Sequence, residues 1–229
     1  FTGRGERVDY EKACALAIRL AGQGVHGVFP CGTTGEGLLM TIDERKRLIA
    51  EVVKAVRGRI KVVAHTGCFD TASTIELTCH AFEAGADAAG VVTPGFYGYD
   101  DVSLSAHFGA VAKAAHGAPI LLYNIPGCAR NVLAPKLIVE LANRHENIVG
   151  MKDSSGNMSA LTQILAHAPR GFTVINGVDE YSYQALLAGA KGCVSSTANV
   201  VPELFLAVFD NVRAGNLKKA WNAQIKLSD

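Results

Sequence analysis

The sequence lacks the features that would place it among nucleic-acid-binding or membrane proteins. Its 229 residues carry a formal net charge of +1, from 22 basic and 21 acidic side chains. This balance provides neither the basic patch that nucleic acid requires nor a polybasic membrane-binding segment. No apolar run of about 18 residues occurs, so no transmembrane helix is predicted, and the opening residues lack the pattern of a signal peptide. We therefore expect a cytoplasmic protein without nucleic-acid or membrane partners.

Several site signatures are also missing. The six cysteines occur singly, with no CxxC pair, and several fall on apolar segments. This spacing indicates reduced cysteines rather than a disulfide framework or a zinc site. The seven histidines lie on separate predicted elements, and the chain contains no HExxH, P-loop or GxSxG motif. We therefore expect no metal centre.

What the sequence does contain is one repeated alternation of apolar runs and helical patterns. Seven apolar runs are each followed by a helical pattern, and one more helical pattern precedes them. The runs cover residues 26–32, 60–67, 86–94, 118–126, 147–152, 172–177 and 191–197. Their continuous apolar character is typical of strands buried on both faces of a parallel sheet. No linker or charge block interrupts the series, so we predict a single domain over residues 1–229.

Two architectures fit this alternation, a doubly wound sheet and a (β/α)8 barrel. The GxGxxG match at residues 22–27 follows a helical pattern and opens a strand, the reverse of a dinucleotide-binding motif. We interpret it as a helix end with glycine in the left-handed region and predict an α/β protein with a (β/α)8 TIM barrel. Because the first helical pattern starts near Val8, we expect strand 1 and part of the C-terminal helical region to be missing from this sequence.

Polar residues gather where the predicted strands end, which is where barrel enzymes place their active sites. Lys152 closes the apolar run 147–152, although a lysine is costly to desolvate as a cation. It is either a side chain that reaches out to water or a group held for chemistry. The other strand ends carry Thr33-Thr34, His65, Thr93, Tyr123-Asn124, Asn176-Gly177 and Ser195-Ser196-Thr197.

These residue types suit Schiff-base chemistry. A desolvated lysine loses its proton easily and becomes a nucleophilic amine that condenses with a ketone. A nearby tyrosine such as Tyr123 can transfer protons, and the glycine-flanked Thr33-Thr34 turn can bind the carboxylate of a 2-oxo acid. Each also has a structural interpretation: a packed tyrosine, a tight turn, and for His65 a rim or packing residue. Because all of these residues fall at the same end of the predicted barrel, we favour the catalytic interpretation.

Four motifs, in this order and spacing, resemble the dihydrodipicolinate synthase/N-acetylneuraminate lyase family of pyruvate-dependent class I aldolases. They are GTTGEG (32–37), YNIPG (123–127), GMKDSSGN (150–157) and GAKGCVSSTANV (189–200). The resemblance covers essentially the whole chain. It implies a (β/α)8 barrel that assembles as a homotetramer or dimer of dimers. It also implies Lys152 as the Schiff-base lysine with no separate cofactor, Tyr123 as the proton-transfer tyrosine, and Thr33 and Thr34 as carboxylate binders.

The sequence differs from the synthases at two positions, and both concern binding of the aldehyde, which is the second substrate after pyruvate. In the synthases, an arginine one residue after YN(V/I)P grips the carboxylate of the aldehyde; Cys128 stands in that place here, with Arg130 two residues later. The synthases also carry a tyrosine two residues after the TP of the fourth strand, lent across the subunit interface. Here that position is Phe96, followed by Tyr97. Both differences count against a dihydrodipicolinate synthase, unless Arg130 and Tyr97 substitute after a local shift.

Other residues resemble the lyases. The segment AHTGC (64–68) is similar to their third strand, and NGVDEY (176–181) is similar to a segment whose acidic residues contact sugar hydroxyls. The resemblance assigns that role to Asp179 and Glu180; the alternative is that they stabilise the start of the following helix. We also expect Gly177, Ser196, Phe96 and Tyr97 to contribute to substrate binding.

The sequence thus predicts a carbon–carbon lyase that forms or cleaves a 2-oxo acid, with pyruvate as one fragment and an aldehyde as the other. A sugar-acid substrate is favoured, as in N-acetylneuraminate lyase or a 2-keto-3-deoxy-aldonate aldolase. One alternative is 4-hydroxy-tetrahydrodipicolinate synthase, which condenses pyruvate with aspartate semialdehyde. An alternative of another class is a non-catalytic 2-oxo acid sensor. The presence of Lys152, Tyr123 and both threonines argues against a sensor.

Overall fold

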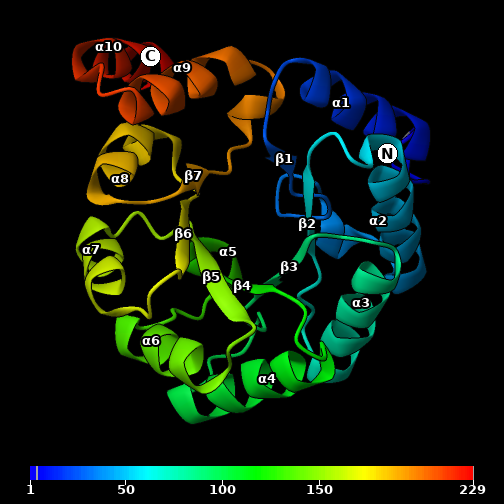
Figure 1. Cartoon of the computed structure of the whole chain (residues 1–229). Helices are drawn as coiled ribbons and strands as arrows, with labels where there is room; N and C mark the ends of the chain where they lie inside the picture. Colours follow the sequence, from blue (N-terminus) through cyan, green and yellow to red (C-terminus); the bar gives the residue numbers. More distant parts are fainter. Residues whose placement is uncertain (4, 229) are drawn as a thin grey trace.

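In the part of the chain that the structure describes, seven parallel strands form one curved sheet, with helices packed around its outside (Figure 1). The computed structural model describes residues 1–3 and 5–228. Neighbours in the sheet follow chain order, from β1 to β7. The strands are β1 (Gly27–Val28), β2 (Lys61–His65), β3 (Ala88–Val92), β4 (Ile120–Asn124), β5 (Ile148–Asp153), β6 (Thr173–Asn176) and β7 (Gly192–Cys193). This TIM-barrel-like arrangement confirms the predicted α/β fold class.

Helices alternate with the strands as the sequence predicts. They are α1 (Tyr10–Gly22), α2 (Ile42–Val56), α3 (Thr71–Glu83), α4 (Asp101–Ala114), α5 (Pro126–Ala129), α6 (Pro135–Arg144), α7 (Met158–His167), α8 (Ser182–Ala188), α9 (Pro202–Arg213) and α10 (Leu217–Ser228). Short 3-10 helices are η1 (Gly37–Leu39), η2 (Asp179–Tyr181) and η3 (Thr197–Asn199). Within the described residues, no helix is long and apolar enough to cross a membrane.

Local sequence explains where these helices begin. The side chains of Asp9, Asp70 and Asp100 each accept a backbone N–H in the first turn of α1, α3 and α4. Thr41 and Glu44 form a complete capping box at the start of α2, because each side chain bonds the other residue's backbone. Such caps satisfy N–H groups that the helix itself leaves unpaired.

The end of the chain differs from the prediction. The sequence pattern predicts one closing helix over residues 202–224, whereas the structure has α9 and α10 with a break between them. Gly215 in the break has φ of +75°, a left-handed conformation that favours glycine and ends a helix. The short α5, with Pro126 in its first turn, was not predicted either.

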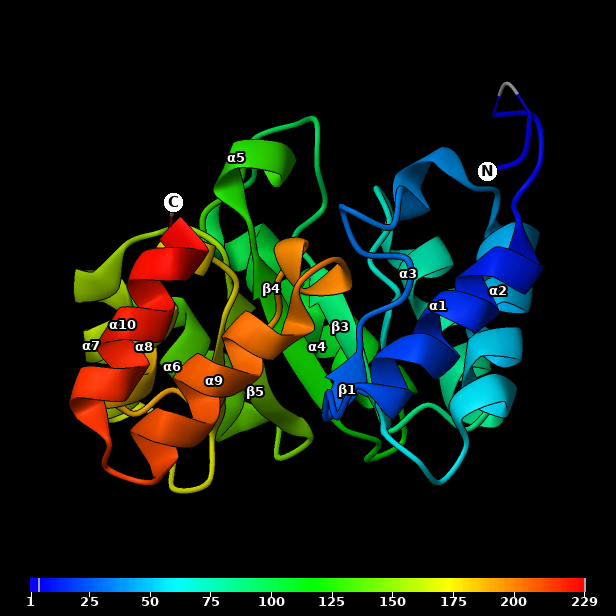
Figure 2. The same cartoon turned by 90° about the horizontal axis from the view of Figure 1, so that it is seen from above.

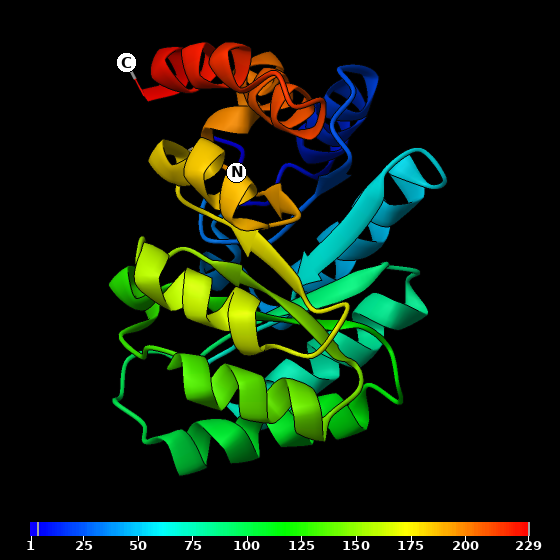
Figure 3. The ribbon, with the colours of Figure 1, turned by 60° about the vertical axis from the view of Figure 1, so that its left-hand side comes forward.

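The core lies between the sheet and the outer helices. Every residue of β3 and β4 is buried, which confirms strands covered on both faces. Figure 3 shows α4, α6 and α7, in green to yellow-green, stacked along one side of the strands. The largest apolar cluster lies there and includes Phe108, Ile138 and Met151.

The sheet is open between β1 and β7, which do not pair with each other in the described part of the chain. Helices α1 and α9 lie on either side of this opening (Figure 1). A cavity of about 840 Å³ extends from it into the interior, lined by apolar side chains such as Leu20, Val28 and Phe209. The same cavity reaches Lys152 and Tyr123. The additional strand expected from the sequence stays a prediction.

Candidate active site

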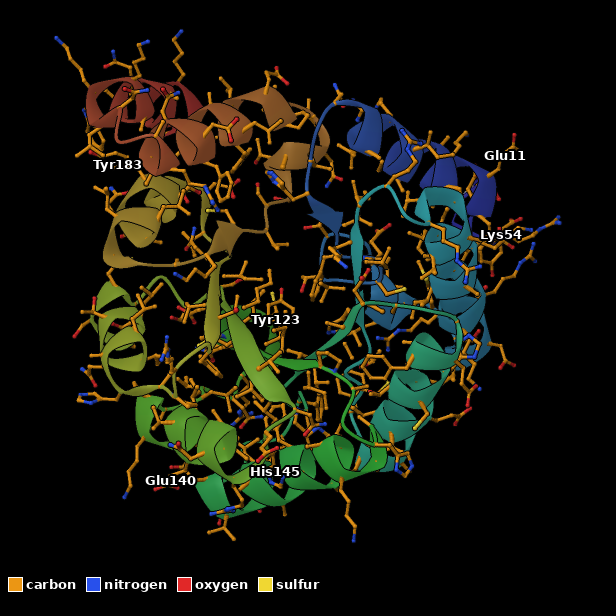
Figure 4. The ribbon with its side chains drawn as sticks, in the orientation of Figure 1. Glu11, Lys54, Tyr123, Glu140, His145 and Tyr183 are labelled. Carbon is orange, nitrogen blue, oxygen red and sulfur yellow. The ribbon has the colours of Figure 1, made fainter. Side chains whose placement is uncertain are left out.

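Parallel register places the central residues of the site side by side. Tyr123 on β4 is paired with Lys152 on β5, and the next pair is Asn124 with Asp153. Because side chains alternate between the faces of a strand, Tyr123 and Lys152 face the interior, where Figure 4 shows Tyr123 inside the ring of strands. Asn124 and Asp153 occupy the opposite face.

Lys152 is held inside the protein. Its side chain is 6 % exposed, and its Nζ lies 3.9 Å from the centroid of the Tyr123 ring. It donates a hydrogen bond of 3.0 Å to Ser154 Oγ, and no carboxylate lies within salt-bridge distance among the described residues. The side chain therefore does not reach out to bulk water.

The same environment makes Lys152 easier to deprotonate than an ordinary lysine. Burial lowers the pKa of Lys152 to about 8, and the nearby charges of Asp153 and Asp179 offset this effect only in part. A lysine with an ordinary pKa of about 10.4 is almost wholly protonated at pH 7. With a pKa of about 8, roughly a tenth of the molecules carry the nucleophilic amine at that pH.

Tyr123 connects the lysine to the turn after β1. The Tyr123 ring is 2 % exposed, and its hydroxyl lies 3.2 Å from Thr33 Oγ1. Burial raises the pKa of Tyr123, while the Thr33 hydroxyl acts in the opposite direction. The phenol is therefore kept protonated between an amine and a hydroxyl. This arrangement suits a residue that transfers protons.

The backbone of the Thr33-Thr34 turn adopts conformations and close contacts that few residues allow. Cys31 and Glu36, on either side of it, both have positive φ angles of 61° and 53°. A Cβ on Gly37 would lie 2.0 Å from the carbonyl oxygen of Cys31, so only glycine fits there. The glycines of GTTGEG thus allow a compact turn, and both threonines line the interior cavity.

Gly177 keeps space open beside the amine. It follows β6, and its N–H donates to Asp153 O at 2.7 Å. A Cβ at this position would lie 3.1 Å from Lys152 Nζ and 2.1 Å from Ser154 Oγ. A side chain here would therefore compete with any molecule that bonds to Nζ. Ser196 also lines the cavity, just before η3.

The acidic residues Asp179 and Glu180 lie in η2. Asp179 is close enough to Lys152 to raise its pKa, and its backbone oxygen accepts a bond from Gln224 on α10. Neither carboxylate caps α8, whose start has no side-chain cap hydrogen bond. Both acids do lie in the first turn of η2, which leads directly into α8, so a role in stabilising the start of this helical segment stays open beside substrate binding.

Among the residues expected to select the aldehyde, Phe96, Tyr97 and Arg130 lie on the rim of the protein, whereas Cys128 is close enough to raise the pKa of both Lys152 and Tyr123. Phe96 and Tyr97, on the loop after β3, are 73 % and 65 % exposed and do not line the cavity around Lys152. Arg130 donates to the backbone oxygen of Phe96 at 3.4 Å. Cys128 is exposed on α5, which Figure 2 shows standing at one end of the sheet. The structure thus places Arg130 on the Phe96 loop and not on the lysine.

Sequence reasoning overlooked two residues, Ser154 and Arg45. Ser154 accepts the hydrogen bond from Lys152, and the serines of GMKDSSGN were the available signal. Arg45 is 2 % exposed on α2. Its signal was an arginine three and four residues before Leu48 and Ile49, on the apolar stripe of that helix.

Among residues 1–3 and 5–228, no cluster of three or more His, Cys, Asp or Glu side chains could hold a metal ion. All six cysteines are free, with Cys31 and Cys68 buried. The reactive groups in contact at the site are the Lys152 amine, the Tyr123 phenol and the hydroxyls of Thr33 and Ser154. Groups of these types are found in enzymes that form covalent adducts with carbonyl compounds.

Comparison with known proteins agrees with this class and defines the family. The sequence model described as "Dihydrodipicolinate synthetase family" matches residues 3–229. The chain belongs to this family of pyruvate-dependent class I aldolases and is a carbon–carbon bond enzyme of that type.

Two curated relatives carry the name 4-hydroxy-tetrahydrodipicolinate synthase. The one from Exiguobacterium is 40 % identical over 221 residues, covering 96 % of this chain and 75 % of the relative. The one from Methanopyrus kandleri is 36 % identical over 220 residues, covering 96 % and 73 %. These names favour the synthase alternative over the predicted sugar-acid substrate.

Solved structures show the same architecture. Dihydrodipicolinate synthase from Aquifex aeolicus is 34 % identical with a TM-score of 0.95, covering 99 % of this chain and 77 % of that one. YagE from E. coli K12, a prophage protein of the same family solved with pyruvate, is 30 % identical with the same TM-score and coverage.

Proposed function

We propose that the protein condenses pyruvate with aspartate semialdehyde through a Schiff base on Lys152, as a 4-hydroxy-tetrahydrodipicolinate synthase does. The observation that carries the proposal is the buried, carboxylate-free Lys152 amine in contact with the Tyr123 ring. The names of the relatives supply the acceptor aldehyde.

The first half of the reaction joins pyruvate to the enzyme. The neutral Lys152 amine attacks the C2 carbonyl of pyruvate, the carbonyl oxygen leaves as water after protonation, and an imine remains. Tyr123 and Thr33, 3.2 Å apart, form a path along which protons reach the departing oxygen. The N–H groups and hydroxyls of the Thr33-Thr34 turn bind the pyruvate carboxylate.

The second half forms the carbon–carbon bond. Loss of a proton from the pyruvate methyl group converts the imine to an enamine. Its carbon attacks the aldehyde carbon, and the aldehyde oxygen takes a proton to become a hydroxyl. The space beside Gly177 and the cavity mouth admit the second substrate. The amino group that came with aspartate semialdehyde then attacks the imine carbon and closes a ring; the bond to Nζ breaks, Nζ takes a proton and leaves as the amine of Lys152, and the cyclic product is released.

Borohydride trapping tests the covalent step. Borohydride reduction in the presence of pyruvate, followed by peptide mass mapping, should yield a stable adduct on Lys152. Lys191 lines the same cavity but is exposed, so Lys191→Met is the matched control and should keep the adduct. A folded protein that gives no adduct with pyruvate or with longer 2-oxo acids would refute the proposal.

A second candidate is the sugar-acid aldolase predicted from the sequence. It is favoured by Cys128 in the place of the synthases' arginine and by the position of Arg130 on the Phe96 loop. Turnover of aspartate semialdehyde and of a panel of sugar aldehydes with pyruvate distinguishes the two. If Cys128 limits a synthase, Cys128→Arg raises aspartate semialdehyde turnover. If sugar aldehydes are turned over faster by the unaltered protein, the second candidate is correct.

We further propose that the enzyme works without an added cofactor or metal and assembles as a homotetramer in the cytoplasm. Full activity after chelation, together with the mass from analytical ultracentrifugation, tests the first two points. Activity with any aldehyde also excludes the non-catalytic sensor.

A further inference from the structure

A second buried cation lies behind the site. The guanidinium of Arg45 is 2 % exposed and forms no ion pair within the described residues. Only neutral acceptors surround it. Nη1 donates to Gly67 O at 3.1 Å and to Cys68 Sγ at 3.2 Å, while Nη2 donates to His65 O at 2.9 Å and to His65 Nδ1 at 3.1 Å. A buried charge without a carboxylate is costly, so the arrangement calls for a functional explanation.

The contact with Nδ1 fixes the chemical state of His65. Arginine stays protonated and can only donate, so Nδ1 must be the unprotonated acceptor. His65 is therefore neutral, with its proton on Nε2. Burial and the charge of Arg45 both act in this direction and lower the pKa of His65 to about 3.

His65 in turn contacts the proton-transfer tyrosine. The rings of His65 and Tyr123 meet edge to face, with centroids 5.7 Å apart and planes at 90°. Phe29 packs against both rings, at 5.9 Å from His65 and 5.6 Å from Tyr123. The Tyr123 ring thus contacts His65, Phe29 and Lys152 Nζ, and its hydroxyl lies within hydrogen-bond distance of Thr33.

We propose that Arg45 and His65 are a positioning pair that holds the Tyr123 hydroxyl in place for proton transfer at Lys152. Arg45 orients the His65 ring, and the ring orients Tyr123. Neither residue touches the reacting atoms. The inference rests on the proposed Schiff base at Lys152.

The test uses pyruvate alone, so it does not depend on the acceptor aldehyde. Exchange of the pyruvate methyl protons with deuterated water reports proton transfer, and borohydride trapping reports adduct formation. His65→Asn keeps an acceptor for Arg45 but removes the ring, whereas His65→Phe keeps a ring but removes the acceptor. Both variants should exchange about tenfold more slowly at saturating pyruvate, because small misplacements of a catalytic group reduce rates strongly, with the trapped fraction unchanged.

A double-mutant cycle separates positioning from general damage. In a Tyr123→Phe background, which lacks the hydroxyl, His65→Asn should cause no further loss of exchange. His107→Asn is the matched control, because His107 is also buried, bonds Thr71 through Nδ1 and packs on Phe108, but lies on α4. It should reduce thermal stability without slowing exchange.

Three outcomes would overturn the inference. They are exchange at the wild-type rate in folded His65→Asn, losses that multiply in the Tyr123→Phe background, or an equal loss in His107→Asn. If His65→Asn does not fold, Arg45→Lys carries the same test through the same cycle. A wild-type protein without a Lys152 adduct overturns the proposed function and this inference together. An adduct with independent losses overturns only the inference.

Discussion

Two buried cationic side chains flank the active site, and their surroundings differ: Lys152 contacts the Tyr123 ring directly, whereas Arg45 reaches it only through His65. Lys152 has one serine hydroxyl and two aromatic faces around its Nζ. Arg45 has four acceptors around its two terminal nitrogens, although its Nε has none. Neither has a carboxylate within salt-bridge distance in the described residues.

The difference follows from the chemistry of the two side chains. A lysine can escape the cost of burial by releasing its proton, and an under-solvated pocket therefore produces a nucleophile. An arginine does not release its proton in proteins, so its pocket must supply acceptors and it becomes a fixed anchor. Burial of a positive charge thus produces a reactive group at one site and an anchoring group at the other.

Exchanging the two side chain types tests this contrast, and the largest effect is expected at Lys152. Lys152→Met and Lys152→Arg should both abolish the pyruvate adduct and lower turnover by at least about 1,000-fold, since the nucleophile is lost. Their stabilities should differ. Lys152→Met should raise the free energy of unfolding by about 1–3 kcal/mol at pH 7, because it removes a group whose pKa is lowered to about 8.

Lys152→Arg should instead destabilise the protein, because a guanidinium in this pocket stays charged with few acceptors. Chemical denaturation at pH 7 measures both changes. Equal stability of the Met and Arg variants would contradict the contrast between the two pockets.

The next effect comes from removing the hydroxyl of Tyr123, whose ring contacts Lys152 directly and Arg45 through His65. Tyr123→Phe should lower turnover by about 100-fold, the range typical of a lost proton-transfer group. Its stability should change by less than about 1 kcal/mol, since a single partly buried hydrogen bond to Thr33 is lost. Steady-state kinetics and thermal unfolding measure the two quantities; a large stability loss with unchanged turnover would make Tyr123 a packing residue.

Replacing Arg45 by lysine should change the stability of the protein. Arg45→Lys should lower the free energy of unfolding by about 2 kcal/mol at pH 7, because fewer acceptors are satisfied. The buried lysine should have a lowered pKa, so the folded state binds fewer protons than the unfolded state. Stability should then rise with pH above 7 more steeply than in the wild type. Urea titrations from pH 7 to pH 10 test this; a parallel pH dependence would contradict it.

The last effect concerns the stability of the protein in acid. The pKa of His65 is lowered to about 3, so His65 stays neutral in the folded protein while it is protonated in the unfolded chain below about pH 6.5. Its contribution to stability is present above pH 6.5 and is lost as the pH falls towards 3. The loss between pH 7 and pH 5 should be about 2 kcal/mol.

His107, whose pKa is lowered to about 4, adds a loss in the same direction. His65→Asn should therefore remove only the share of His65 in the acid sensitivity, and urea midpoints at pH 7 and pH 5 measure that share. An unchanged pH dependence in His65→Asn would show that His65 is not held neutral.

Much of this architecture could be predicted from the sequence because it depends on local periodicity. Continuous apolar runs identified all seven strands, and the Thr41/Glu44 pair identified the start of α2. The closing helix was predicted as one because its apolar pattern continues past Gly215, and a single glycine does not always end a helix. The Arg45 contacts could not be predicted, because α2 and the end of β2 meet only through tertiary packing.

The sequence by itself determined the order of strands and helices, and it determined that Lys152 and Tyr123 fall at strand ends, since both depend on patterns of neighbouring residues. Only the tertiary structure decided that β4 and β5 pair with these two residues in register. It also decided that Lys152 is enclosed without a carboxylate, whereas Arg45 has four acceptors. The physical reason is that charge and pKa depend on solvent exclusion and on partners distant in sequence, such as Arg45 and His65.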